Sequence, residues 1–344
     1  MIFRQHLPGP AAHSTGRRRF VLRAGAASLA FAWGAQAQGQ ATAPAFPNRA
    51  IRLVLPLGPG SANDVAGRLI AAGLQRRLKQ AVVVENHPGG GGTIGTGVVA
   101  KAPPDGYTIG FGTLSTLVAN AALYARLSFD IEKDVVPIAL VTRAPLLLLT
   151  NPKAPAQDLP ALLAYAKANP GKVTYGSAGV GSINHVFTEA MAERAGVKLL
   201  HVPYKSNGPA LIGLAGGEVD LLFDTAISVA ALSSKGMISV IGAGAAERLR
   251  GFPQVPSFAE AGLPGFDAST WSAIIAPRAT PAAIVGLLRA EINAVLQEPE
   301  VRSGIERTGS EVLQFATGET GDAFILAERR RWVPVIRALN LELN

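Results

Sequence analysis

Short apolar segments alternate with helical patterns along most of this chain. The segment 51–55 predicts a buried strand, and in 64–78 the apolar residues Ile70, Leu74 and Leu78 recur on one face of a helix. The alternation restarts after the Pro-rich connection 151–157. Such a pattern is typical of α/β domains in which much of the sheet is parallel. We therefore expect an α/β protein of two lobes, with a cleft beyond the carboxyl ends of its strands.

The same reading predicts the secondary structure of both blocks. Strands are expected at 51–55, 82–85, 107–112, 146–150, 173–175, 199–202, 221–223 and 239–242. Helices are expected at 64–78, after the loop 86–92 as far as about 100, and at 159–168, 183–195, 208–215, 281–297, 300–308 and 323–339.

The first 37 residues account for most of the net positive charge. The 344-residue chain has a formal net charge of +8, and residues 1–37 contribute five arginines and no acid. The apolar run 24–35 is too short to span a bilayer, and the ending AQA at 35–37 is typical of a cleaved export signal. The triple arginine at 17–19 resembles a twin-arginine signal, and an ordinary secretion signal fits equally well. We expect a signal peptide at 1–37, a leader at 38–45, and no nucleic-acid binding.

Known catalytic and metal-binding motifs are absent from the sequence. The chain has no cysteine, which excludes a disulfide scaffold, a thiolate metal site and a cysteine nucleophile. Metalloprotease, P-loop, nucleophile-elbow and EF-hand motifs do not occur. Beyond the signal, the histidines are not at metal-ligand spacings. We therefore expect no cofactor, no metal and no enzymatic activity.

The glycine-rich run 89–97 follows a predicted strand and opens a predicted helix. A phosphate-binding loop is one interpretation of such a run. A structural turn is the favoured one, because tight strand-to-helix turns need glycine for backbone reasons alone.

Three loops rich in small residues lie at predicted strand-to-helix junctions. They are 58–64 (GPGSAND), 176–185 (GSAGVGSINH) and 202–209 (VPYKSNGP). Each exposes backbone N–H and hydroxyl groups at the start of a helix, where the partial positive charge favours a carboxylate. The alternative is that these loops only cap helices, with Asn63 or Ser182 satisfying the first turn. The three loops together favour an anion-binding cleft.

Several motifs follow one another over nearly the whole chain after the signal, and together they resemble the Bug family, the substrate-binding proteins of tripartite tricarboxylate transporters. They are FPNRAIRLV at 46–54, PGSAND at 59–64, VVEN at 83–86 and APPDGYT at 102–108. The second half adds SAGVGS at 177–182 with His185, VPYK at 202–205, GEVDLLFD at 217–224, and VPSFAEAGLPGF at 255–266 with Trp271.

The resemblance implies a two-lobed periplasmic binding protein of type II, each lobe a mixed, mostly parallel sheet flanked by helices. Lobe 1 is expected at 46–145 and 265–344, and lobe 2 at 146–264. Such a periplasmic protein would capture a small carboxylate between its lobes and deliver it to the membrane components of a tripartite tricarboxylate transporter. The same scaffold leaves two alternatives open, an exported enzyme and a ligand-presenting sensor subunit.

The resemblance also implies which residues contact the ligand. Serine hydroxyls would donate to a carboxylate, the two aspartates would orient loops or accept from the ligand, and the lysine is the nearest cation. This sequence departs from the family at Ser61, usually a glycine, and at Ser206-Asn207, where glycines are common. The family's best-known ligands are therefore not assumed. The expected ligand-binding residues are Ser61, Asn63, Asp64, Thr113, Ser115, Ser177, Gly181, Ser182, His185, Tyr204, Lys205 and Asp224.

Overall fold

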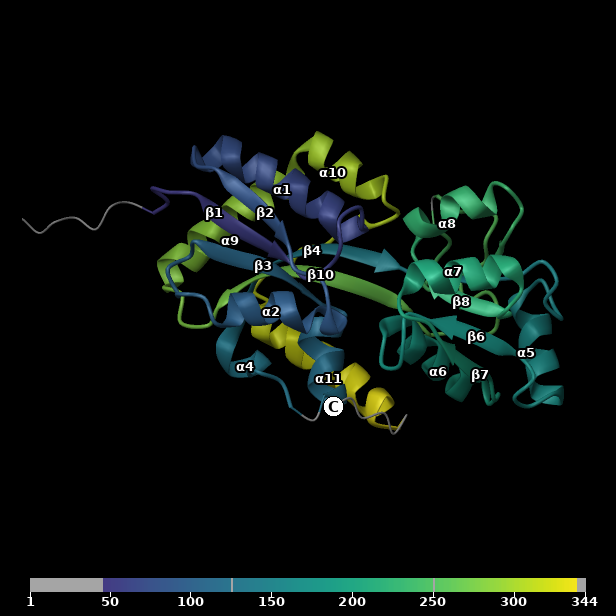
Figure 1. Ribbon diagram of the computed structural model, residues 1–344. Coiled ribbons are helices and arrows are strands. Elements are labelled where there is room, and N and C mark those ends of the chain that lie inside the picture. The colour runs from purple at the N-terminus through teal and green to yellow at the C-terminus, as the bar shows by residue number, and fades with distance from the viewer. Residues whose placement is uncertain (1–45, 125, 250, 339–344) are drawn as a thin grey trace, which may run out of the picture. The chain divides into compact units, whose positions relative to one another are not determined.

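The computed structural model describes residues 46–124, 126–249 and 251–338, which form two β-sheets covered by helices (Figure 1). The expected signal peptide at 1–37 and leader at 38–45 lie outside the described residues. The two-lobed α/β fold class is confirmed, with one sheet in each lobe. The exact residue boundaries of the lobes stay a prediction.

The first sheet has six strands from both ends of the described chain. Its order is β11 (Glu311–Val312), β4 (Val135–Pro145), β10 (Ser269–Pro277), β3 (Thr108–Thr113), β1 (Ile51–Leu55) and β2 (Val82–Asn86). The longer helices of this part are α1 (Ala62–Leu78), α2 (Thr93–Ala100), α9 (Ala282–Gln297), α10 (Pro299–Glu306) and α11 (Gly321–Ala338). Short helical segments are η1 (Gly90–Gly92), η2 (Ser115–Ala119), α3 (Asn120–Leu123) and α4 (Ile131–Asp134).

The second sheet has five strands from the middle of the chain. Its order is β7 (Leu200–Pro203), β6 (Thr174–Ser177), β8 (Leu221–Asp224), β5 (Leu147–Thr150) and β9 (Ser239–Ala243). Its helices are α5 (Leu159–Ala168), α6 (Ile183–Ala195), α7 (Asn207–Gly216) and α8 (Ala226–Ser233).

Both sheets are mixed, as expected, but parallel pairs do not predominate. Parallel pairing joins β1 to β2 and β3, and β6 to β7 and β8. Strand β10 pairs antiparallel with β3 and β4, β11 with β4, and β5 with β8 and β9. The expectation of a mostly parallel sheet is therefore too strong. In the first sheet the long strands β4 and β10 were not predicted, and in the second sheet β5 runs antiparallel to both of its neighbours.

The first sheet buries its apolar faces as the alternation of strands and helices predicts. Leu53 and Leu55 of β1 are fully buried and pack in one cluster with Ile70 and Leu74 of α1. Leu288 of α9 belongs to the same cluster. Helix α1 therefore lies on the sheet through the apolar face that its sequence predicts.

The glycine-rich run after β2 is required by close packing. A Cβ on Gly92 would lie 2.5 Å from Cγ2 of Thr116, and Gly92 has a φ of +91°. A Cβ on Gly95 would lie 2.7 Å from Cα of Pro56. These contacts support the structural interpretation of the run.

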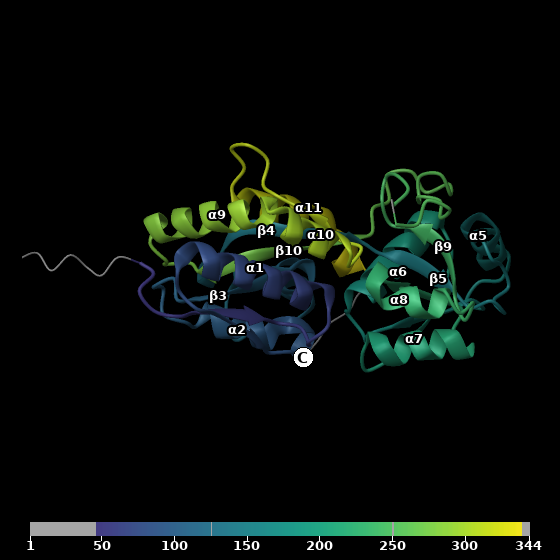
Figure 2. The same ribbon diagram turned by 90° about the horizontal axis from the view of Figure 1, so that it is seen from above.

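Two chain crossings join the sheets side by side (Figures 1 and 2). Leu146 lies between β4 and β5, and its amide donates to the Ala268 carbonyl at 2.9 Å. The Gly244 amide donates to the Leu146 carbonyl at 2.8 Å. The segments that link the sheets are therefore bonded to each other.

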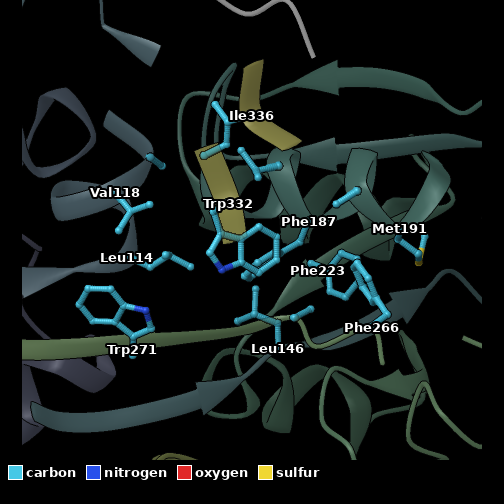
Figure 3. Packing of buried hydrophobic residues seen from close by; sticks show 14 of the residues in the cluster. Leu114, Val118, Leu146, Phe187, Met191, Phe223, Phe266, Trp271, Trp332 and Ile336 are labelled. Atoms are coloured by element: carbon cyan, nitrogen blue, oxygen red, sulfur yellow. The ribbon is translucent and has the colours of Figure 1, made fainter. Parts of the chain in front are cut away.

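An apolar cluster continues from one sheet to the other (Figure 3). It includes Leu114 from the end of β3 and Phe223 of β8. Trp332 of α11 lies near its centre, with its ring centroid 4.8 Å from that of Phe187 in α6. The last helix therefore packs against both halves of the fold.

Candidate functional site

A cavity of about 390 Å³ lies where residues of both sheets meet. That volume is in the range of small-molecule sites, about 300–1,000 Å³. Its wall is formed at the ends of β3 and β8 and at the N-terminal ends of α1, α6, α7 and α8. The lining residues are Leu57, Gly60, Ser61, Ala62, Asn63, Thr113, Ser115, Thr142, Ala144, Leu146, Ile183, Asn184, Asn207, Phe223, Asp224, Thr225, Ile227, Ser228, Thr270, Trp271 and Ser310.

The N-terminus of α1 presents two unpaired amides at this wall. Ser61 caps the helix, since its Oγ accepts from the Asp64 amide at 3.2 Å and its carbonyl from the Val65 amide at 3.0 Å. The alternative that Asn63 caps this helix is wrong, because Asn63 lies inside its first turn. Within the described chain, the amides of Ala62 and Asn63 have no hydrogen-bond partner. They are donors available to an anion.

Asp64 is buried behind the same loop and supports it without lining the cavity. Its carboxylate accepts from the Gly60 amide at 3.0 Å, from Asn86 Nδ2 at 2.9 Å, and from Arg68 Nη2 and Nε at 3.0 and 3.1 Å. Burial pushes the pKa of Asp64 up, but the hydrogen bonds from Arg68, Gly60 and Asn86 outweigh it, and the pKa is lowered. An ionised Asp64 therefore holds the loop that carries Ser61 in place.

The end of β3 contributes hydroxyl groups. The Thr113 amide donates to Thr116 Oγ1 at 2.9 Å, and the Thr116 amide donates to Thr113 Oγ1 at 3.3 Å. Thr113 and Ser115 line the cavity, and their contact with a ligand stays a prediction. The reciprocal bonds fix the turn between β3 and η2, which places the Ser115 hydroxyl at the wall.

On the second-sheet side, the side chains of two asparagines form a chain of hydrogen bonds. Asn184 Nδ2 donates to Asn207 Oδ1 at 2.8 Å and to the Phe223 carbonyl at 3.2 Å. Asn207 Nδ2 then donates to Asp224 Oδ1 at 3.2 Å. Both asparagines line the cavity, although neither was among the predicted contacts. Both lie in the first turn of a helix that follows a small-residue loop, and this position in the sequence could have indicated them.

Asp224 ends β8 and is 2% exposed. Its Oδ1 accepts from the Thr225 amide at 2.7 Å in addition to Asn207. Its Oδ2 is buried and has no partner within the described chain. Burial raises the pKa of Asp224, against the opposing effect of the hydrogen bond from the Thr225 amide.

The predicted loop 177–182 folds back on itself and does not line the cavity. The hydroxyls of Ser177 and Ser182 both donate to the Gly179 carbonyl, at 3.0 and 2.7 Å. Ser177 Oγ also lies 2.6 Å from His201 Nε2. These serines are committed to internal bonds, and their role as ligand contacts stays a prediction.

His185 belongs to a buried aromatic stack under that loop. Its ring lies 3.9 Å from that of His201, centroid to centroid, and Tyr175 stacks on His201 at 4.8 Å. Its Nδ1 accepts from the Gly181 amide at 3.0 Å. Burial, with a smaller effect of His201, lowers the pKa of His185 to about 4. Neither His185 nor Gly181 lines the cavity, so His185 packs beneath the loop, and the role of both residues as ligand contacts stays a prediction.

Tyr204 and Lys205 also lie off the cavity wall. Tyr204 Oη donates to Glu218 Oε2 at 2.9 Å, and Lys205 is exposed. Sequence reasoning also missed Thr142, Thr225, Ser228, Thr270, Trp271 and Ser310 as lining residues.

The electrostatics of the wall come from backbone dipoles. Among the described lining residues none is basic, and Asp224 is the only one with an ionisable side chain. Four helices of eight or more residues begin at the wall, and each N-terminus carries roughly half a positive charge. Such a cavity can hold an anion through amides and hydroxyls.

Within the described ranges, no group of three His, Asp or Glu side chains could hold a metal ion. The helices of the described part include none that is both long and apolar enough to cross a bilayer.

Comparison with known proteins places this site in a family of transport receptors. The family model "Tripartite tricarboxylate transporter family receptor" (TctC) matches residues 66–341. Protein BugT of Bordetella pertussis is 36% identical, over 88% of this chain and 93% of its own.

Two solved structures from Rhodopseudomonas palustris have the same fold. Rpa4515 with adipate is 31% identical with a TM-score of 0.77, over 86% of this chain and 99% of its own. MatC with bound malate is 33% identical with a TM-score of 0.73, over 85% of this chain and 100% of its own. The chain belongs to the tripartite tricarboxylate transporter receptor family, which includes the Bug proteins.

Proposed function

We propose that this protein is a periplasmic solute-binding protein that captures a small organic carboxylate in the cavity between its sheets. It then delivers the carboxylate to the membrane components of a tripartite tricarboxylate transporter. The observation that carries the proposal is the pair of unpaired amides, Ala62 and Asn63, at a wall with no basic side chain among its described residues.

Binding by amides fits the chemistry of a carboxylate. Each carboxylate oxygen accepts hydrogen bonds from donors at a helix N-terminus, where the helix dipole adds to the attraction. The Ser61, Thr113 and Ser115 side chains lie on the same wall and add hydroxyl groups. The adipate- and malate-bound relatives support a carboxylate as the ligand class.

The sheet crossings support a binding protein that opens and closes. Leu146 and Ala268 are adjacent and bonded, so the two halves can rotate about a narrow pair of strands. Closure would exclude water from the cavity and strengthen the hydrogen bonds to the ligand.

The test replaces one amide N–H at the wall by a ring carbon and keeps the helix. Proline is favoured at the first position of a helix, and Ser61 has φ −70° and ψ 160°, which is compatible with a following proline. The variant Ala62→Pro therefore removes the Ala62 N–H while α1 persists. The matched control Ala62→Ser keeps the N–H at the same place.

Calorimetric titration of residues 38–344 with mono-, di- and tricarboxylates would give the dissociation constants. We expect Ala62→Pro to weaken the best carboxylate about 10- to 100-fold, the range for a hydrogen bond to a charged group, and Ala62→Ser to leave it nearly unchanged. Lys205→Ala, which lies off the wall, should also leave it unchanged. Equal affinity in Ala62→Pro and the wild type, or conversion of the ligand during incubation, would overturn the proposal.

A further inference from the structure

One buried acceptor on the cavity wall lacks a donor. Asp224 lines the cavity and is 2% exposed, yet its Oδ2 has no hydrogen-bond partner within the described chain. Its other oxygen is fully engaged, with the Thr225 amide at 2.7 Å and Asn207 Nδ2 at 3.2 Å. One oxygen of the carboxyl group therefore accepts two hydrogen bonds, and the other accepts none within the described chain.

The neighbouring hydroxyls lie near the carboxyl group, and within the described chain neither has a hydrogen bond to Oδ2. Burial raises the pKa of Asp224, and Ser228 Oγ is close enough to oppose that rise. Ser228 Oγ nevertheless bonds Thr225 Oγ1 at 2.9 Å, and the contact of Thr225 Oγ1 with the carboxyl is to Oδ1. A buried carboxylate oxygen without a donor costs free energy, since it has lost its water. A group that supplies the missing donor regains that free energy when it binds.

We propose that Asp224 is a specificity residue, and that it selects carboxylates that also carry a hydroxyl or ammonium hydrogen-bond donor. This inference rests on the proposed function, because it assigns the second contact of the same ligand. The shared chemistry of the two groups is an O–H or N–H that donates to Asp224 Oδ2.

The opposite ends of such a ligand suit the two sides of the cavity. Its carboxylate fits the unpaired amides of Ala62 and Asn63, which belong to the first-sheet part. Burial already raises the pKa of Asp224 because it disfavours the charged form, and a ligand carboxylate directly against Oδ2 would add like-charge repulsion, whereas an O–H or N–H donor would not. The donor group therefore belongs at Asp224, on the second-sheet part, and the carboxylate farther from that group belongs at α1.

The experiment compares ligands that differ by one group. Succinate, malate and aspartate share one carbon skeleton and carry hydrogen, hydroxyl or ammonium at the same carbon. Glutarate with 2-hydroxyglutarate, and adipate with 2-hydroxyadipate, repeat the hydroxyl comparison for longer chains. Each is titrated calorimetrically into the wild type and into Asp224→Asn, which keeps the shape and removes the acceptor charge. The malate-to-aspartate ratio separates a hydroxyl from an ammonium ligand.

We expect the wild type to bind the best donor-bearing acid about 10- to 100-fold more tightly than its plain counterpart, as for a hydrogen bond to a charged group. In Asp224→Asn that ratio should fall to about twofold or less, with most of the loss in affinity on the side of the donor-bearing acid. Preference for the plain acids in the wild type, or an unchanged ratio in Asp224→Asn, would overturn the inference. Unchanged affinity in Ala62→Pro would overturn the proposed function, whereas an unchanged ratio in Asp224→Asn overturns this inference alone, so the two failures are distinguishable.

Discussion

The two tryptophans of the described chain differ in the state of their indole nitrogens, and this difference predicts unequal costs of replacement. Trp271 is 5% exposed, and its Nε1 donates to Glu328 Oε2 at 2.6 Å. Trp332 is 3% exposed, and its Nε1 has no partner within the described residues. We therefore expect Trp332→Phe to be much better tolerated than Trp271→Phe, although the two rings are equally buried.

The magnitudes follow from area and hydrogen bonding. Replacing a buried indole by a phenyl ring loses roughly 40 Å² of apolar contact, or about 1 kcal/mol at 25 cal/mol per Å². At Trp332 this loss is offset by about 1–3 kcal/mol, because an unpaired buried N–H is removed. At Trp271 the loss adds to about 1.5–3 kcal/mol for the bond to Glu328. The two variants should differ by about 2.5–6 kcal/mol in free energy of unfolding.

The assay is urea unfolding of residues 38–344, followed by circular dichroism. Trp332→Ala is the control that shows the ring to be packed, with an expected cost of about 3–5 kcal/mol. Equal costs for Trp332→Phe and Trp271→Phe would refute the reasoning, since they would show that the unpaired Nε1 of Trp332 is not a liability. A cost below about 1 kcal/mol for Trp332→Ala would refute the packing of α11 against α6.

Three further predictions concern pH and packing. The hydrogen bond from Arg52 lowers the pKa of Glu85 from 4.5 to about 2. The stabilisation by ionised Glu85 is therefore present above pH 4.5 and lost as the pH falls toward 2. In Glu85→Gln, the urea midpoint should change less with pH between 4.5 and 2. Burial lowers the pKa of His185 from 6.5 to about 4. Between these pH values only the unfolded chain takes up this proton, so stability falls as the pH falls. In His185→Gln, the urea midpoint should change less with pH between 6.5 and 4. Gly309 has φ +76°, and a Cβ there would lie 2.3 Å from Cβ of Ala226, so Gly309→Ala should lower the free energy of unfolding by about 1–2 kcal/mol or more. No loss in thermal unfolding for Gly309→Ala, or unaltered curves for the other two variants, would contradict these expectations.

Local signals explain where the sequence predicted the fold well. Helices α5 and α6 occupy the predicted residues. Asp158 caps α5 by accepting from the Ala161 amide at 2.8 Å, and Gly196 ends α6 in the left-handed region at φ +66°. Both are short-range effects of single residues, which a sequence displays directly.

Long-range pairing explains what was missed. Strand β4 has a buried apolar run at 138–141, but Pro137 precedes it and the polar residues Thr142 and Arg143 follow it, so the sequence did not indicate a strand of this length. It is held by antiparallel pairing with β10, more than a hundred residues later. Because partners so distant leave no periodic signal, the lining residues Thr142 and Trp271 were also missed.

The candidate site also has one part that the sequence predicted and one part that it did not. The loop 58–64 was predicted to contact a ligand, and its residues Ser61 and Asn63 line the cavity. The helix cap at Ser61, which fixes the end of this loop, depends on residues close in sequence and could therefore be predicted. The loop 177–182 has a similar composition, yet its hydroxyls turn inward to the Gly179 carbonyl. Composition cannot distinguish a loop that faces a cavity from one that satisfies itself.

A site that binds an anion through amides depends on geometry more than on charge. An arginine can follow a displaced carboxylate, whereas the Ala62 amide can donate only along the direction that α1 gives it. That direction is held by Ser61 and by Asp64, whose carboxylate is in turn held by Arg68 and Asn86. The ligand therefore has to fit a rigid donor set at one end. In the proposed role of Asp224, that residue selects the group at the other end of the ligand, so selectivity in this cavity would follow from one acceptor and not from added cations.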